Sequence, residues 1–309
     1  MSGTLISGTP MNAAAVPAGR TARRRDPGRR GRRGANRQLS AGWGTYLILG
    51  VILVVSVFPL YWTVVAASHD NSAISRTPPT LLPGPRLLEN IGKVFTSTDM
   101  RLALTNSFIV SAVVTASVVF TSTLAGFAFS KLRFRGREAL LGIVVATMMV
   151  PPQLGIIPLY IMMANWLHWS NQLQALIIPA AANAFGVFFM RQYLVTALPT
   201  ELLEAGRLDG CSTWRLYWHV VLPVARPAAA VLGLLTFMAT WNDFFWPLVV
   251  MTQQNPTVQV SLSALQSGYV RDYSLVLSGA LISTLPILVV FALMGRQILG
   301  GIMQGAVKG

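Results

Sequence analysis

The stretch ELLEAGRLDGCSTWRLYWHVVLPVARP, residues 201–227, carries charged side chains and an Asp-Gly pair, yet it lies between two long apolar runs. The pair Asp209-Gly210 is typical of a turn, because glycine adopts a left-handed backbone conformation at low cost. Before this turn, four apolar residues recur at helical spacing, and we expect them on roughly one side of a helix: Leu202, Leu203, Ala205 and Leu208.

The ends of two short helices are indicated by residues that favour helix boundaries. We expect Thr200 to be the N-cap of the first helix. Ser212 or Thr213 can cap the second helix. Pro223 is expected to end that helix, since proline lacks the backbone N–H that a continuing helix needs. Residues 199–223 are therefore predicted to form a helix hairpin.

The composition of the whole chain predicts a membrane protein. Its 309 residues are 53% hydrophobic and 11% charged, with a mean hydropathy of +0.56, whereas a soluble domain carries roughly a quarter charged residues. Backbone polar groups in lipid must be paired within their own segment, so we expect an all-α, polytopic protein. Six runs are long enough to cross a bilayer: 46–68, 104–129, 139–163, 174–195, 227–251 and 275–298.

The distribution of basic residues predicts the orientation of these six transmembrane helices. Nineteen of the 24 basic residues fall on the side of the N-terminal tail if the runs cross in turn. Cytoplasmic loops carry such an excess, so both termini, and the hairpin between the fourth and fifth spans, are expected in the cytoplasm of a bacterial plasma membrane. The basic tail, residues 1–41, is expected to be disordered and to contact the lipid bilayer rather than nucleic acid. Residues 42–309 are expected to form the six-span domain.

Several kinds of chemistry find no support in the sequence. A single cysteine, Cys211, provides neither a disulfide framework nor a thiolate metal cluster. No GxxxxGK[ST] segment is present, so a P-loop for ATP is not expected. Neither Cys211 nor His219 has the partners of a catalytic triad or metal site near it, and packing is the favoured role of both. The chain is therefore not expected to be an enzyme.

Two features inside the expected spans indicate a pathway for a polar solute. WNDFFWPL, residues 241–248, places an amide and a carboxylate among aromatic rings. A charge at the bilayer centre costs at least ~2.5 kcal/mol and is expected to face a cavity or the bundle interior. Pro151-Pro152 must interrupt the third span. The candidate substrate-pathway residues are Gln153, Trp241, Asn242, Asp243, Phe245 and Trp246. A structural or gating role for Asp243, and a static packing kink at the two prolines, remain open alternatives.

The run E-A-G-x-x-D-G-x₆-Y-x₄-L-P, from Glu204 to Pro223, resembles the EAA signature of ABC-importer permeases. That signature reads E-A-A-x-x-D-G, followed by an aromatic residue and a Leu-Pro close. Gly206 and Cys211 stand where alanine is usual, and both are small. WNDFFWPL and the terminal GAVKG (305–309) resemble maltose-type carbohydrate permeases in particular. MVPPQLGIIPLY and GGIMQGAVKG look most like cellobiose-type permeases, and the likeness covers nearly the whole chain from about residue 42.

This resemblance implies a permease subunit that imports di- or oligosaccharides by alternating access. The partners that it implies are a second homologous permease, two ABC ATPase subunits and an extracytoplasmic sugar-binding protein. ATP and Mg²⁺ would be bound by the ATPase subunits, and no cofactor or metal by this chain. The hairpin would be the coupling helix, seated in a cleft on an ATPase subunit. The residues that the resemblance assigns to ATPase coupling are Glu204, Ala205, Gly206, Asp209, Gly210, Tyr217 and Pro223.

An ion-coupled secondary transporter of a small polar solute is the competing interpretation. Such proteins also carry ionisable residues inside the membrane, and they often show inverted repeats. This sequence has one intramembrane carboxylate that stands out, Asp243, and no evident inverted repeat. Whether uptake depends on an ATPase subunit separates the two interpretations.

Overall fold

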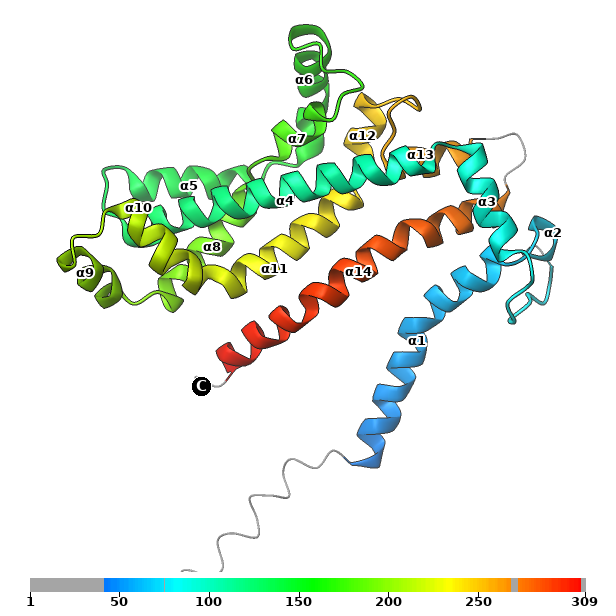
Figure 1. Cartoon of the computed structure of the whole chain (residues 1–309), viewed down its shortest axis with the longest axis horizontal. Coiled ribbons are helices and arrows are strands. Elements are labelled where there is room, and N and C mark those ends of the chain that lie inside the picture. Colours follow the sequence, from blue (N-terminus) through cyan, green and yellow to red (C-terminus); the bar gives the residue numbers. More distant parts are fainter. Residues whose placement is uncertain (1–41, 75, 268–271, 307–309) are drawn as a thin grey trace, which may run out of the picture. The chain divides into compact units, whose positions relative to one another are not determined.

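The computed structural model describes residues 42–74, 76–267 and 272–306, and every regular element within these ranges is helical (Figure 1). The predicted all-α fold is thereby confirmed. The chain divides into two units, Met1–Ser56 and Val57–Gly309. The described part of the first unit is the beginning of α1 (Trp43–Ala67), where every side chain is exposed. The basic tail 1–41 and the last three residues of GAVKG lie outside the described residues.

Four helices are long and apolar enough to cross a membrane: α1, α4 (Met100–Lys131), the continuous helix Thr213–Trp241, and α14 (Tyr273–Ala306) through Leu293. Two further candidates are helix pairs with a sharp bend. Within the expected third span, α5 (Arg137–Thr147) and the segment Pro152–Trp166 meet at 88°. Within the expected fourth span, α7 (Gln174–Ala180) and α8 (Ala184–Ala197) meet at 40°. By length and composition, the described residues therefore hold four to six candidate spans.

The third expected span is interrupted where its sequence predicts. Helix α5 ends at Thr147, and a 3₁₀ turn, η3 (Pro152–Gly155), begins at the second proline of the Pro151-Pro152 pair. Helix α6 (Ile156–Ile161) and a π-turn, η4 (Met162–Trp166), complete this segment. Neither proline has a backbone N–H to donate, so the α-helical ladder cannot continue through them.

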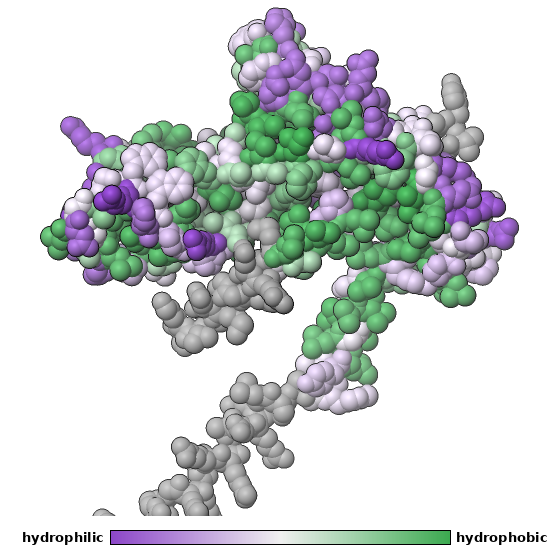
Figure 2. All heavy atoms as spheres, in the orientation of Figure 1, coloured by the Kyte–Doolittle hydropathy of each residue, from purple (hydrophilic) through white to green (hydrophobic). Residues whose placement is uncertain are grey.

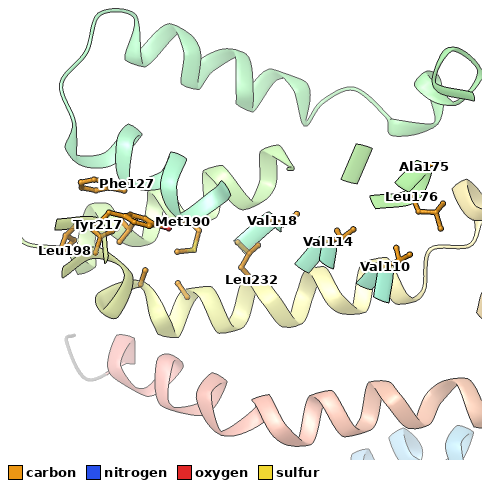
Figure 3. Close-up of a cluster of buried hydrophobic side chains, with 14 of the residues drawn as sticks. Val110, Val114, Val118, Phe127, Ala175, Leu176, Met190, Leu198, Tyr217 and Leu232 are labelled. Carbon is orange, nitrogen blue, oxygen red and sulfur yellow. The ribbon is translucent and has the colours of Figure 1, made fainter. Parts of the chain in front are cut away.

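The main core lies where α4 packs against α8 and α11 (Leu222–Trp241) (Figure 3). Val114, Val118 and Leu232 are among its buried side chains. Small residues allow α4 and α8 to approach closely, as expected from the Ser, Thr and Ala content of the second span. A Cβ atom added at Gly126 of α4 would lie 2.8 Å from the backbone N of Arg191 in α8, closer than real Cβ contacts come.

A second core joins the opposite end of α4 to α14. Its buried side chains come from α3 (Leu87–Ser97), α4, α11, α13 (Val258–Leu265) and α14, with Phe237 and Trp241 stacked at 5.8 Å between ring centroids. Figure 2 shows apolar side chains over the middle of this face, and polar side chains near α9 and α10, near α2 and α3, and at the top around α6 and α12.

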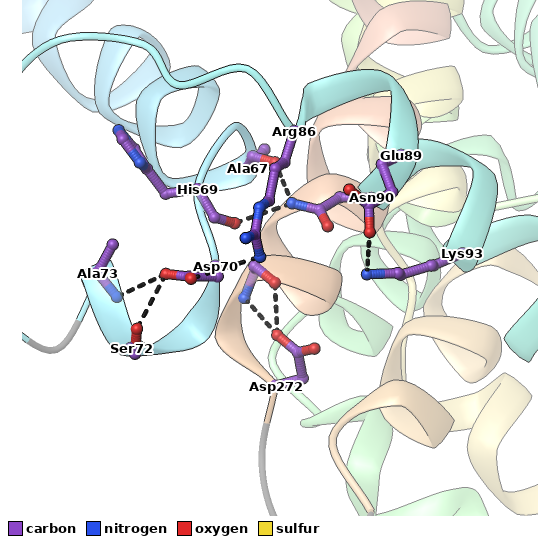
Figure 4. A network of polar contacts seen from close by, with 11 residues as sticks. Ala67, His69, Asp70, Ser72, Ala73, Arg86, Glu89, Asn90, Lys93 and Asp272 are labelled. Carbon is purple, nitrogen blue, oxygen red and sulfur yellow. Dashed lines mark hydrogen bonds and ion pairs between the residues drawn. The ribbon is translucent and has the colours of Figure 1, made fainter.

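A polar network joins the C-terminal end of α1 to α2 (Asn71–Ile74), α3 and the start of α14 (Figure 4). Hydrogen bonds from the backbone N–H of Ala73 and the hydroxyl of Ser72 lower the pKa of the Asp70 carboxyl, and Arg86, 3.4 Å away, acts in the same direction. The side-chain amide of Asn90 donates to the carbonyl oxygens of Ala67 at 2.8 Å and His69 at 2.9 Å. The last carbonyls of α1 are therefore paired within the protein.

Asn90→Leu is expected to lower the unfolding free energy by about 1–3 kcal/mol, because the His69 carbonyl loses the Asn90 donor and the Ala67 carbonyl is left with the Ser278 hydroxyl at 3.3 Å. Thermal unfolding of the purified chain in detergent measures the change. The control is Lys93→Ala, which removes an exposed ion pair to Glu89 (2.7 Å) and is expected to change stability little. Equal losses in the two variants would contradict the role given to Asn90.

Candidate functional site

Three interrupted helices meet at one cavity of about 420 Å³. The first interruption is the Pro151-Pro152 break, which supplies η3 and the start of α6. The second lies between α7 and α8. The third lies between the end of α11 at Trp241 and α12 (Phe245–Val250). Helix α12 contacts both α6 and α7, and Figure 1 shows the three short helices together beyond the end of α11. Irregular backbone at membrane depth is tolerated where it lines a cavity or is buried in protein.

The cavity is lined by most of the candidate substrate-pathway residues. Gln153, Trp241, Asp243, Phe245 and Trp246 all contribute to its wall. Asn242 does not: its side chain is exposed, and its amide donates to the Met238 carbonyl at 2.8 Å, one turn back in α11.

The two tryptophans of the wall have their N–H groups already paired. Trp241 Nε1 donates to the carbonyl of Ser283 in α14 at 3.1 Å, and Trp246 Nε1 donates to the carbonyl of Ala175 in α7 at 3.0 Å. Trp241 is only 2% exposed, so it holds α11 against α14 and contributes little surface to a solute. Phe245 is 53% exposed and is the aromatic residue of the wall that offers most surface for stacking.

The sequence predicts Asp243 inside the fifth span, residues 227–251, but in the structure Asp243 lies between two helices. Helix α11 ends at Trp241, and Asp243 is the middle residue of the three-residue break before α12. The backbone N–H groups of Trp246 and Phe245, in the first turn of α12, interact with its carboxylate. The expected fifth span, 227–251, is therefore two helices with a polar break between them, not one.

Three hydroxyl residues of the wall were not singled out by the sequence: Ser107, Thr240 and Thr257. The Ser107 hydroxyl accepts the N–H of Val258 at 2.9 Å, which fixes the start of α13 against α4. The Thr257 hydroxyl is buried and has no hydrogen-bond partner among the described residues. Of these three, only Thr240 could have been predicted as a cavity residue from the sequence, because it directly precedes WNDFFWPL, residues 241–248.

At the other end of α11, the sequence of residues 199–213 forms a helix, a tight turn and the start of a second helix. Helix α9 (Thr200–Leu208) ends in a Schellman motif, in which the N–H of Cys211 donates to the Gly206 carbonyl and the N–H of Gly210 to the Arg207 carbonyl. Gly210 has a φ of +77°, a conformation that side chains disfavour. Ser212 caps the second helix through the N–H of Arg215 at 3.3 Å.

Two expected helix boundaries are wrong. Pro199, not Thr200, occupies the N-cap of α9, and it makes no side-chain cap hydrogen bond. Pro223 does not end the second helix. Helix α10 (Thr213–Leu216) continues through a π-turn, η5 (Tyr217–Val221), directly into α11. The wider turn carries a hydrogen bond from Leu222 N–H to the Tyr217 carbonyl, and Pro223 then falls in the first turn of α11, where its missing N–H is tolerated.

The residues that the resemblance assigns to coupling lie in two different environments. Tyr217 is buried in the main core, with Phe127 and Trp218 at 6.3 and 5.4 Å between ring centroids. Ala205, Asp209, Gly210 and Pro223 are exposed, and Gly206 is half-buried against Leu216. Glu204 is exposed, and its side chain makes no hydrogen bond or ion pair with any described residue.

The apolar face expected on α9 is only partly buried. Leu203 packs into the main core, whereas Leu202 and Ala205 are exposed and Leu208 is 89% exposed. Trp214 and Trp218, on the second helix, are each half exposed or more. The turn region thus presents apolar side chains beside the carboxylates of Glu204 and Asp209, a composition that fits contact with another protein.

Comparison with known proteins identifies the family. Residues 118–298 match the family described as the inner membrane component of binding-protein-dependent transport systems. The chain belongs to this family. The permease is 36% identical to the lactose transport system permease protein LacG of Rhizobium radiobacter, over 85% of this chain and 95% of the relative. It is 33% identical to the sn-glycerol-3-phosphate transport system permease protein UgpE of Yersinia pestis, over 84% and 94% of the two chains.

Two further comparisons agree with this assignment. The arabinooligosaccharides transport system permease protein AraQ of Halalkalibacterium halodurans is 30% identical to the permease over 86% of this chain and 96% of that protein. A bacterial ABC transporter involved in the import of the acidic polysaccharide alginate has a chain of the same fold, with a TM-score of 0.69, 23% identity, and coverage of 81% of this chain and 94% of that one. The permease is therefore a membrane component that works with other parts of an ABC transporter, and it is not an enzyme.

Proposed function

We propose that this permease forms the translocation pathway for a di- or oligosaccharide together with a second, homologous permease subunit. The observation that carries the proposal is the cavity, where three interrupted helices bring Gln153, Asp243 and the ring of Phe245 to one wall. Sugar hydroxyls require hydrogen-bond partners, while the apolar faces of sugar rings stack on aromatic side chains. Discontinuous membrane helices form substrate sites in other transporters for the same reason. The relatives named for lactose and arabinooligosaccharides support this substrate class.

The remaining components of the proposed importer are two ABC ATPase subunits, which bind ATP and Mg²⁺, and an extracytoplasmic sugar-binding protein. The turn between α9 and α10 is the surface that we assign to an ATPase subunit. Two observations support this assignment. The Glu204 carboxylate is unpaired among the described residues and lies one helical turn from the exposed side chain of Leu208, and α9, which carries both residues, is anchored in the main core by Leu203. This assignment places the turn and both termini in the cytoplasm, in agreement with the excess of basic residues on that side.

The mechanism that follows is alternating access. Closure of the ATPase subunits would move the α9–α10 turn, and the core at Tyr217 would pass this movement to α11, whose far end borders the cavity. The cavity would then open toward the binding protein, and ATP hydrolysis would return it to the inward-facing state. The chain itself forms and breaks no covalent bond in this cycle.

The test is uptake of radiolabelled cellobiose and lactose by proteoliposomes that contain the assembled importer, with ATP inside and the binding protein outside. Ala239→Trp, which fills part of the cavity, is expected to lower uptake at least about tenfold, because a solute of disaccharide size needs that volume. The control, Ala139→Trp, adds the same side chain at an exposed position outside the cavity and is expected to leave uptake unchanged.

The same assay separates the importer from an ion-coupled transporter. Uptake that continues without ATP, or that a protonophore abolishes while ATP is present, would contradict the proposal. Uptake that Ala239→Trp leaves at the wild-type rate would show that the sugar takes another route.

A further inference from the structure

The wall of the cavity carries charge of only one sign. Asp243 is the one residue with a charged side chain among the described residues that line it, and neither lysine, arginine nor histidine contributes to the wall. The other polar wall residues, such as Gln153 and Thr240, are neutral. A solute in this space therefore meets a carboxylate and no counter-charge from the wall.

Asp243 also occupies backbone donors that could otherwise hold an anion. Its carboxylate interacts with the N–H groups of Trp246 and Phe245 at the start of α12. The N–H groups of the two wall tryptophans are paired with the carbonyls of Ser283 and Ala175. The donors that the wall still offers, such as the side-chain amide of Gln153 and the hydroxyl of Thr257, are neutral, so no cation is present to balance an anion.

We propose that Asp243 is a specificity-determining residue, which makes the cavity accept uncharged sugars and exclude anionic sugars of the same size. Hydroxyl groups can donate to the carboxylate, and hydrogen bonds to an ionised acceptor are about twice as strong as neutral ones. A second carboxylate a few ångströms away is repelled instead, by about tenfold or more in affinity. The proposal rests on the proposed function, since it concerns the same cavity.

The comparisons show why such a residue is needed. One relative is named for glycerol 3-phosphate, and a transporter of the same fold is involved in the import of the acidic polysaccharide alginate, both of which are anionic. The fold therefore does not fix the charge of the solute. The charge of the solute then depends on individual side chains of the importer, and Asp243 is the charged side chain that the described wall of this cavity holds.

The experiment compares cellobiose with cellobiouronic acid, a disaccharide of similar size that carries one carboxylate. Saturation-transfer difference NMR gives the Kd of each probe for the assembled importer, with both permease subunits, in nanodiscs. The wild-type chain is expected to bind cellobiose at least about tenfold more tightly. In Asp243→Asn, which keeps the shape of the side chain, the two Kd values are expected to agree within about threefold. Asp99→Asn, a carboxylate at the start of α4 and outside the cavity, serves as the matched control and should keep the wild-type ratio.

A second variant keeps the proposal testable if Asp243→Asn fails to fold. Gln153→Lys places a positive charge on the same wall at an exposed residue and is expected to tighten binding of cellobiouronic acid at least about tenfold. Equal binding of the two probes by the wild-type chain, binding of neither probe, or an unchanged ratio in the variants would each overturn the proposal. Sugar uptake driven by ATP with an unchanged ratio would leave the proposed function standing and remove only the role of Asp243.

Discussion

Glu204→Lys is expected to reduce ATP-driven sugar uptake to background while the permease remains in the membrane at its wild-type amount. The side chain of Glu204 is exposed and has no partner among the described residues, so the permease alone has little to lose from the change. In the assembled importer, the reversed charge would face the surface of the ATPase subunit that accepts the turn, and a misplaced like charge at an interface costs several kcal/mol. Uptake and ATP hydrolysis, measured on the same proteoliposomes, report the loss of coupling.

Gly210→Val tests the same surface through the backbone. Gly210 has a φ of +77°, and a β-branched residue in the left-handed region is strained by about 1–2 kcal/mol or more. The turn between α9 and α10 would change shape although no atom of the described residues lies within 4 Å of the added Cβ atom. We expect uptake to fall to background in this variant as well.

The matched control for the charge reversal is Glu138→Lys. Glu138 is exposed at the start of α5, outside the α9–α10 turn, and pairs with its neighbour Arg137 at 2.6 Å. An exposed pair of this kind contributes little to stability. Normal uptake in Glu204→Lys and Gly210→Val would show that the turn does not transmit the work of the ATPase subunits.

Gly126→Leu is expected to prevent α4 from packing against α8 and to abolish the folded state. The missing side chain at Gly126 lets the backbone of Met190 and Arg191 approach so closely that even an added Cβ atom would lie 2.8 Å from the Arg191 backbone N. Overpacking by a few methyl groups costs typically 1–3 kcal/mol, which is a large part of the stability of a domain. Leucine adds more atoms than the interface can accommodate without separating the helices.

The measurement is the yield of monodisperse protein in detergent, together with its thermal unfolding. Gly142→Leu is the control, because Gly142 lies in α5 and a Cβ atom added there has no neighbour within 4 Å in the part of the chain that the structure describes. Leucine also favours a helix over glycine by roughly 0.8–1 kcal/mol. A folded, stable Gly126→Leu protein would show that the contact between α4 and α8 is not required.

The sequence predicts best what depends on backbone chemistry. Two adjacent prolines must interrupt a helical ladder, and the structure places a bend of 88° at Pro151-Pro152. A glycine after an aspartate favours the left-handed conformation, and Gly210 has it. Long apolar runs in a chain with few charges form helices, since lipid offers no hydrogen bonds. These inferences need only the residue and its immediate neighbours.

Features that depend on tertiary contacts could not be predicted in the same way. Pro223 was expected to end a helix, but a π-turn just before it lets the helix continue, and nothing in the residue pattern signals that turn. Leu208 occupies an apolar helical position, but only the packing of α9 shows that it is exposed. Ser107 and Thr257 reach the cavity because α4 and α13 meet there, although the two residues are 150 positions apart in sequence.

The continuous helix from Thr213 to Trp241 can act as a rigid lever between the α9–α10 turn and the cavity. Its 29 residues, at 1.5 Å each, make a rod about 43 Å long. One end follows the turn at Gly210, the other borders the cavity beside Asp243, and the middle is held in the main core by the buried residues Ala225 and Ala228. A tilt of about 5° around that middle point would displace the two ends by about 2 Å in opposite directions. In the proposed mechanism, a push on the α9–α10 turn would therefore move the wall of the cavity in the opposite direction.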